Sequence, residues 1–200
     1  MTKKCVLVAI IAFEAFALIL SAGCSGTLAA YLRKAACDGD IERVTKFLKL
    51  GANVNTTDGF GYSALIDVEA CRRHDDLIQS RAQILELLIT NGATVNHRAR
   101  DGRTALMYAA ENGDTQAVNT LLRNGASVNL ADNDGETALM KAATSSCTEE
   151  TVRALLNAGA DLNARDRKGR NALDSFRSSY ACPDSTVGDL LQKTTNGNTQ

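Results

Sequence analysis

The stretch DGRTALMYAAENGDTQAVNTLLRNGASV, which occupies residues 101–128, decides the fold. A turn at Asp101 precedes Thr104, whose hydroxyl can cap a first short helix, and Asp114 can cap a second one. The second helix carries an apolar stripe at i, i+3 and i+4, which is typical of an amphipathic helix: Val118, Leu121 and Leu122. A turn followed by two short antiparallel helices is too thin to bury its own apolar faces. The unit therefore needs neighbours.

The chain supplies these neighbours as repeats. A Gly-Ala pair recurs at Gly51, Gly92, Gly125 and Gly159, so successive pairs lie 41, 33 and 34 residues apart. The apolar stripe of the second helix recurs five times in phase with these pairs. With this period, the segments GASVNLADNDGETALMKAA and GADLNARDRKGRNAL resemble the ankyrin repeat. The resemblance covers residues 28–191 and implies an all-α ankyrin-repeat solenoid of about five helix-turn-helix repeats with short finger turns.

The second repeat departs from the family pattern in two ways. It carries about eight extra residues between its helices, and Val68-Glu69 replaces the small Ala-Ala pair of other repeats. We expect looser stacking there. The insertion, residues 72–81, is a second candidate binding surface, because a long loop in a compact repeat is often functional.

The N-terminus is predicted to be an export signal. Lys3 and Lys4 precede an apolar run over residues 6–20, which is typical of a secretory signal covering residues 1–23. The run ends in Leu-Ser-Ala-Gly-Cys at Cys24, which resembles a bacterial lipoprotein signal. The resemblance implies that Cys24 is lipidated after cleavage, and an uncleaved anchor or plain secretion are the alternatives.

The expected domain organisation follows from this signal. Residues 24–27 would form the lipidated N-terminus and a linker, residues 28–191 the repeat domain, and residues 192–200 a disordered tail. A lipid-anchored chain would face the periplasm. The residue after Cys24 is Ser25 and not aspartate, which favours the outer membrane over the inner membrane. The lipid anchor would be the contact with the bilayer.

The cysteines fit an oxidising compartment. Four remain if Cys5 leaves with the signal and Cys24 is lipidated, and four cysteines allow three pairings. Each of the four follows a first helix of the repeats. Because the four cysteines lie at similar positions within their repeats, we expect neighbouring repeats to pair Cys37 with Cys71 and Cys147 with Cys182. Stacked helices lie about 8–10 Å apart, which exceeds the reach of a disulfide, so we expect the insertions to close the gap. Four reduced thiols remain the alternative.

Composition and motifs point away from catalysis. The formal net charge of −1 excludes a strongly basic nucleic-acid binder. The two histidines, His74 and His97, lie outside any zinc-ligand spacing, and the chain has no phosphate-binding loop or nucleophile elbow. Asp132, Asp134 and Glu136 alternate like calcium ligands, but a solvated acidic turn is the better interpretation. The sequence therefore predicts no enzyme, no cofactor and no metal.

A binding surface is what remains, and the ankyrin resemblance places it on the finger turns and first helices. Exposed aromatic and arginine side chains there are typical protein anchors. Alternatively, the opposite charges of adjacent fingers attract each other and bind nothing else. The candidate partner-binding residues are Phe60, Tyr62, Arg98, Arg103, Tyr108, Asp132, Glu136, Arg167 and Arg170.

The expected function is stoichiometric binding of a protein partner in the periplasm. Small exported ankyrin lipoproteins resemble immunity proteins, which neutralise antibacterial effectors such as phospholipases. A periplasmic scaffold for envelope or oxidative-stress proteins is the main alternative, and a ligand- or metal-binding protein is disfavoured by the two histidines.

Overall fold

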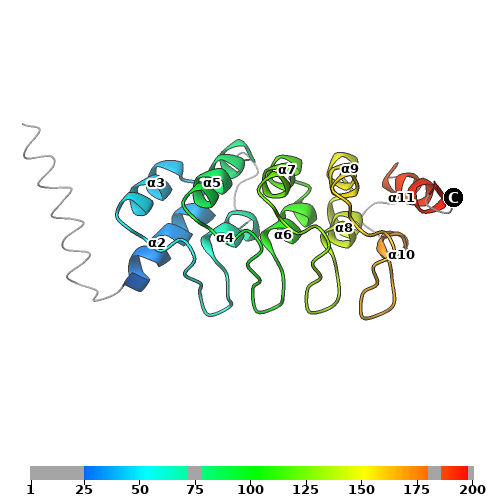
Figure 1. Ribbon diagram of the computed structural model, residues 1–200, viewed down its shortest axis with the longest axis horizontal. Coiled ribbons are helices and arrows are strands. Elements are labelled where there is room, and N and C mark those ends of the chain that lie inside the picture. Colours follow the sequence, from blue (N-terminus) through cyan, green and yellow to red (C-terminus); the bar gives the residue numbers. More distant parts are fainter. Residues whose placement is uncertain (1–24, 72–77, 180–185, 198–200) are drawn as a thin grey trace, which may run out of the picture.

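The chain folds into consecutive helix pairs. A computed structural model describes residues 25–71, 78–179 and 186–197. The pairs are α2 (Ser25–Cys37) with α3 (Ile41–Lys49), α4 (Ala64–Ala70) with α5 (Ile78–Thr90), α6 (Ala105–Asn112) with α7 (Thr115–Arg123), α8 (Ala138–Lys141) and η2 (Ala142–Ser146) with α9 (Glu149–Asn157), and α10 (Ala172–Ser178) with α11 (Thr186–Gly197). Figure 1 shows the pairs side by side along one axis, with the finger turns projecting together from one edge. The predicted all-α repeat solenoid is confirmed.

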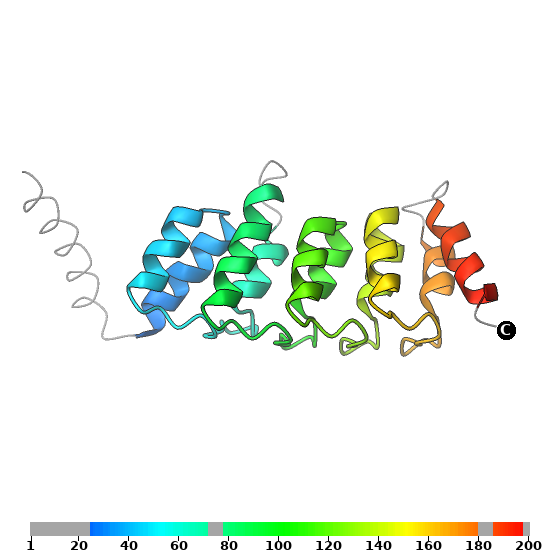
Figure 2. The ribbon, with the colours of Figure 1, turned by 45° about the horizontal axis from the view of Figure 1, so that its top comes forward.

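The helices form two layers with the core between them. Figure 2 shows the second helices, α3, α5, α7, α9 and α11, in front of the first helices. Fully buried side chains come from both layers, among them Leu65, Leu88, Leu121 and Leu155. Because each pair buries its apolar faces against the next pair, the stack has one continuous core. Val68 and Glu69 are both 1% exposed, so the looser stacking expected in the second repeat does not occur.

The helix caps form as predicted. The Thr104 hydroxyl accepts the backbone N–H of Met107 at 3.4 Å, and Asp114 accepts that of Ala117 at 2.9 Å. Ser63 and Thr137 occupy the same place before α4 and α8. Each cap satisfies a backbone donor that the first helical turn leaves free.

Asparagine side chains hold the bases of neighbouring fingers together. Asn55 donates to the carbonyl of Gly92 at 2.9 Å and accepts the N–H of Thr94 at 2.8 Å. Asn96 and Asn129 make the same two bonds one repeat further on. The Val-Asn that follows the first three Gly-Ala pairs carries this signal in the sequence, and our sequence analysis missed it.

The fourth repeat absorbs its extra residue in a π-helix. Its Gly-Ala pair comes 34 residues after the previous one instead of 33. The α8 helix widens into η2, and Cys147 then takes a left-handed conformation with φ 50°. A π-bulge is the usual way to insert one residue in a helix without breaking it.

Three expected boundaries change in the structure. The α5 helix begins at Ile78, so the end of the predicted insertion, residues 72–81, is helical, and Arg81 is 7% exposed. Residues 72–77 lie outside the described part. The α2 helix begins at Ser25, within the expected linker at residues 24–27. The α11 helix continues to Gly197, into the expected disordered tail at residues 192–200. Thr194 donates to the carbonyl of Leu190 at 2.7 Å, which is a contact of a continuing helical turn.

A disulfide joins the first two repeats. Cys37 ends α2 and Cys71 follows α4, and their Cα atoms are 5.2 Å apart. This distance is below the 8–10 Å expected between stacked helices, because both cysteines lie at helix ends and Cys71 has already left the helical conformation. Cys147 is disulfide-bonded as well, and its predicted partner Cys182 lies outside the described residues.

The predicted signal and lipid site, residues 1–24, also lie outside the described part. Within residues 25–71, 78–179 and 186–197, none of the helices combines the length and the apolar character needed to cross a bilayer.

Candidate functional site: the finger and first-helix surface

A row of aromatic rings leads from the first finger onto the first helices. Phe60 at the tip is 71% exposed, and its ring centroid lies 6.4 Å from that of Tyr62. Tyr62 meets Tyr108 of α6 edge to face at 5.9 Å, and the two hydroxyl groups are 2.8 Å apart. We call Phe60, Tyr62 and Tyr108 the aromatic row. Edge-to-face contact and the shared hydrogen bond fix the rings in place before any partner arrives.

Arg103 closes the inner end of the aromatic row. Its guanidinium carbon lies 3.8 Å from the centroid of Tyr108, in cation–π geometry, and its other face pairs with Glu111. Tyr108 is 8% exposed, and burial together with the hydrogen bond shared with Tyr62 raises the pKa of its hydroxyl, which stays protonated. The row therefore offers an exposed ring at the tip and a rigid polar base at Arg103.

A charged cluster from three elements borders the row on the side of the first repeat. Arg33 of α2 pairs with Asp58 of the first finger at 2.8 Å and with Asp67 of α4 at 2.7 Å. Burial raises the pKa of Asp67 to about 6 and outweighs the attraction of Arg33. The ion pair is geometrically good, yet the carboxyl group is costly to keep charged. Asp58 and Asp67 are thus engaged within the fold.

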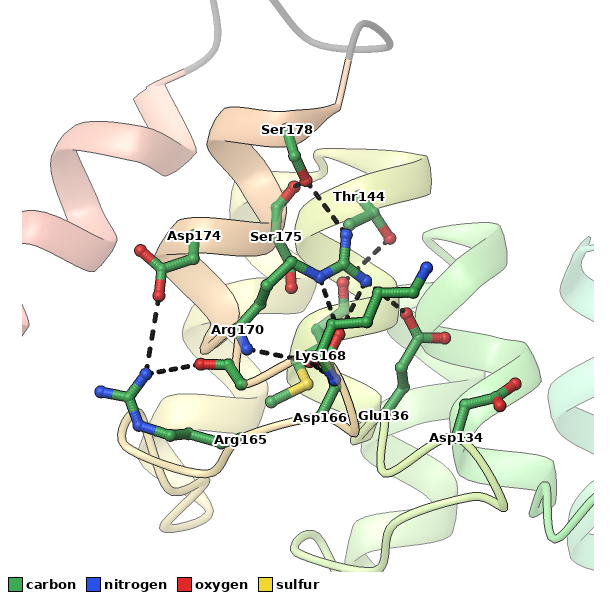
Figure 3. Close-up of polar contacts among 12 residues, drawn as sticks. Asp134, Glu136, Thr144, Arg165, Asp166, Lys168, Arg170, Asp174, Ser175 and Ser178 are labelled. Carbon is green, nitrogen blue, oxygen red and sulfur yellow. Dashed lines mark hydrogen bonds and ion pairs between the residues drawn. The ribbon is translucent and has the colours of Figure 1, made fainter.

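The third and fourth fingers share a second charge network, which Figure 3 shows around Arg170. Lys141 of α8 lies 3.0 Å from Asp132 and also pairs with Glu136. Arg170 bridges the two fingers, 3.6 Å from Glu136 and 2.7 Å from Asp166. Asp132 is 8% exposed, and its second oxygen accepts the backbone N–H groups of its own turn. Opposite charges of adjacent fingers attract here, as the alternative interpretation expects.

The nine candidate residues fall into three groups. Phe60, Tyr62, Arg103 and Tyr108 form one contacting set. Lys141 joins Asp132 to Glu136, and Glu136 also pairs with Arg170. Arg98 and Arg167 belong to neither set. Both are exposed, and nothing in the described part of the chain hydrogen-bonds or pairs with their guanidinium groups. Asp132 and Tyr108 lie deeper than their turn and helix positions suggested, because Lys141 and Arg103 fold over them.

A buried polar cluster lies at the C-terminal ends of the first helices, on the side of the stack away from the fingers. Glu69 of α4 accepts a hydrogen bond from Asn112, while its Oε1 and the Oδ2 of Asp114 have no hydrogen-bond partner among the described residues. Burial, with Asp114 adding to it and Arg81 opposing it, raises the pKa of Glu69 to about 7. Sequence reasoning missed this cluster, although a glutamate in place of the usual alanine signalled it.

Comparison with known proteins agrees with this architecture. Residues 77–166 match the family model described as ankyrin repeats (3 copies). No curated protein matches the chain in sequence. Ankyrin repeats generally mediate protein–protein interaction, so the finger and first-helix surface is the natural place to look for a partner.

Proposed function

We propose that this chain is a non-catalytic binding protein whose partner docks on the finger and first-helix surface, centred on the aromatic row. The observation that carries the proposal is Phe60, which is 71% exposed at the end of a row whose other members are held rigidly. An exposed phenylalanine costs solubility, and the ring contact of Phe60 with Tyr62 leaves most of its surface open to solvent. Rigid aromatic side chains flanked by arginine are typical hot spots of protein interfaces.

The partner we propose is a toxic effector, for example a phospholipase, so that the protein acts as an immunity protein. Lipidation at Cys24 would hold it on the periplasmic side of the outer membrane, beside the surface that such an effector attacks. Tethering raises the effective concentration of an inhibitor where its target acts. A non-catalytic inhibitor must bind tightly one to one, and a preorganised surface favours this.

The test is affinity and inhibition with a secreted phospholipase encoded next to this chain. We expect equimolar inhibition, and a loss of at least about thirtyfold in affinity for Phe60→Ala and for Tyr62→Ala, which corresponds to 2 kcal/mol or more. Asn53→Ala, an exposed change at the base of the same finger, is the matched control. Binding to an envelope or oxidative-stress enzyme without any inhibition would instead favour the scaffold alternative.

A second variant separates the aromatic row from the insertion. Residues 72–77 are replaced by a Gly-Ser linker of the same length, which leaves α5 intact from Ile78 onward. If this variant loses binding while Phe60→Ala and Tyr62→Ala bind normally, the partner docks on the insertion and the proposed surface is wrong. Circular dichroism on each variant shows that the stack is preserved.

Localisation has its own test. Cys24→Ser removes the thiol that would receive lipid, so we expect the protein to move into the soluble periplasm and to lose labelling by a fatty-acid analogue. A mutant that stays membrane-bound would instead contain an uncleaved anchor.

A further inference from the structure

Two of the four fingers carry a pair of arginines on the incoming limb, the segment that leads to the tip of the finger. Equivalent positions in the four fingers follow from the repeat register, with offsets of 41, 33 and 34 residues. At two positions of the incoming limb, fingers one and three have uncharged residues, whereas fingers two and four have arginine at both. The eight residues are Thr57, Gly59, Arg98, Arg100, Ala131, Asn133, Arg165 and Arg167. Positive charge thus recurs on alternate fingers, and none of the four fingers has an acidic residue at either position.

These arginines are available to a partner. Arg98, Arg100 and Arg167 are exposed, and no hydrogen bond or ion pair involves their side chains within the described ranges. The Arg165 side chain is 61% exposed, although its guanidinium donates to the carbonyl of Gly169 at 2.6 Å and lies 3.9 Å from Asp174. By contrast, two aspartates at the intervening position of the other fingers are engaged: Asp58 pairs with Arg33, and Asp132 pairs with Lys141. The charge that the fold leaves open on these limbs is positive.

The backbone fixes the arginines relative to the aromatic row. The N–H of Arg100 donates to the carbonyl of Phe60 at 3.0 Å, and the N–H of Arg167 donates to the carbonyl of Asp134 at 2.8 Å. Phe60 and the arginine pair of finger two are therefore direct neighbours. The pair of finger four lies two repeats further on, roughly 16–20 Å away for two helix spacings of 8–10 Å.

We infer that the partner presents an acidic surface with an apolar side chain at one end: the side chain covers Phe60, one acidic cluster binds Arg98 and Arg100, and a second binds Arg165 and Arg167. This inference rests on the proposed function and specifies its partner. Two separated acidic clusters fit a folded or extended protein segment, since six extended residues span roughly 20 Å. Exposed Asp101 and Asp134 stand between the arginine pairs and would repel a continuous anionic surface, such as a bilayer or a nucleic-acid backbone.

The experiment selects peptides from a displayed random 16-residue library on the full chain. We expect the enriched peptides to be acidic, with two acidic clusters and an apolar residue at one end. Arg98→Glu/Arg100→Glu and Arg165→Glu/Arg167→Glu should each weaken their binding at least tenfold and reduce its salt dependence. Lys46→Glu/Lys49→Glu, which makes the same charge change at two exposed residues of α3, should leave binding unchanged.

The outcomes separate this inference from the proposed function. Peptides without net negative charge, or acidic peptides that bind the arginine variants as well as the α3 control, overturn the acidic-partner inference. If binding of the selected peptides still depends on Phe60 and Tyr62, the proposed docking surface stands without the acidic-partner inference. If their binding depends neither on these aromatic residues nor on the arginines, both the inference and the proposed docking surface are wrong. Binding of phosphatidylglycerol vesicles that the arginine variants abolish would assign the arginines to a membrane surface and also overturn the inference.

Discussion

At the scale of single residues, Glu69 costs the fold stability when it is charged. The folded state keeps its proton until about pH 7, whereas the unfolded chain releases it near the ordinary pKa of 4.5. Folding therefore takes up a proton between these values, and the free energy of unfolding falls as pH rises across them. We expect Glu69→Gln to be more stable than the wild type above pH 7 by roughly 1–3 kcal/mol, and the difference to vanish near pH 4.

Denaturant titrations from pH 4 to pH 8 measure this difference. Glu42→Gln on α3 is the matched control, because Glu42 is exposed and the same atoms change. A constant offset between Glu69→Gln and the wild type at all pH values would show that Glu69 does not titrate differently in the folded state.

A second prediction at this scale concerns two glycines with the same backbone. Gly102 and Gly125 both have φ of +83°, a left-handed conformation that strains any other residue. A Cβ at Gly102 would lie 2.8 Å from the backbone nitrogen of Asn133 in the next finger, whereas a Cβ at Gly125 would meet nothing within 4 Å. We expect Gly125→Ala to cost about 1 kcal/mol and Gly102→Ala to cost at least about 2 kcal/mol, as measured by urea unfolding. Equal costs would mean that the fingers are not packed this closely.

At the scale of elements, the disulfide between α2 and α4 secures the first repeat. A terminal repeat has a neighbour on one side, so it is the part of a solenoid most prone to fray. The cross-link spans 34 residues, and closing such a loop in the unfolded chain is worth roughly 3–4 kcal/mol. Cys37→Ser/Cys71→Ser should therefore lower the free energy of unfolding by about that amount, and hydrogen exchange should rise first in α2 and α3.

The double variant is more informative than a reducing agent, because Cys147 is disulfide-bonded too. Peptide mapping without reduction gives the pairing itself, and a link between Cys147 and Cys182 is the prediction for the other end. Free Cys37 and Cys71 in protein purified without reducing agent would contradict both the pairing and the expected stabilisation.

The elements also show what the sequence can and cannot reveal. Thr104, Asp114 and the period of the Gly-Ala pairs were enough to predict the helix pairs and the caps, because those signals are local. The depth of Tyr108 was not predictable, because the equivalent residue is Asp67 in one repeat and Lys141 in another, and each takes its burial from a different neighbour. The phase of Cys37 and Cys71 predicted their pairing, but their 5.2 Å separation depends on how α4 ends.

At the scale of the whole molecule, stability should be distributed unevenly along the stack. Leu121 of α7 and Leu191 of α11 are both fully buried, and truncating a buried leucine typically costs 2–5 kcal/mol. The α7 helix packs against α5 and α9, whereas α11 packs against α10 and α9 at the end of the described helices. Leu121→Ala therefore removes from an internal repeat the same atoms that Leu191→Ala removes from a terminal repeat.

The two variants should unfold differently, since each repeat contacts only its neighbours. We expect Leu121→Ala to shift the whole urea transition to lower concentration, because its loss weakens the coupling between both halves. Leu191→Ala should let α10 and α11 open before the rest, visible as early hydrogen exchange confined to these helices while residues 105–157 stay protected. If both variants shift one cooperative transition by the same amount, the stack unfolds as a single unit, and the terminal repeats have no separate stability.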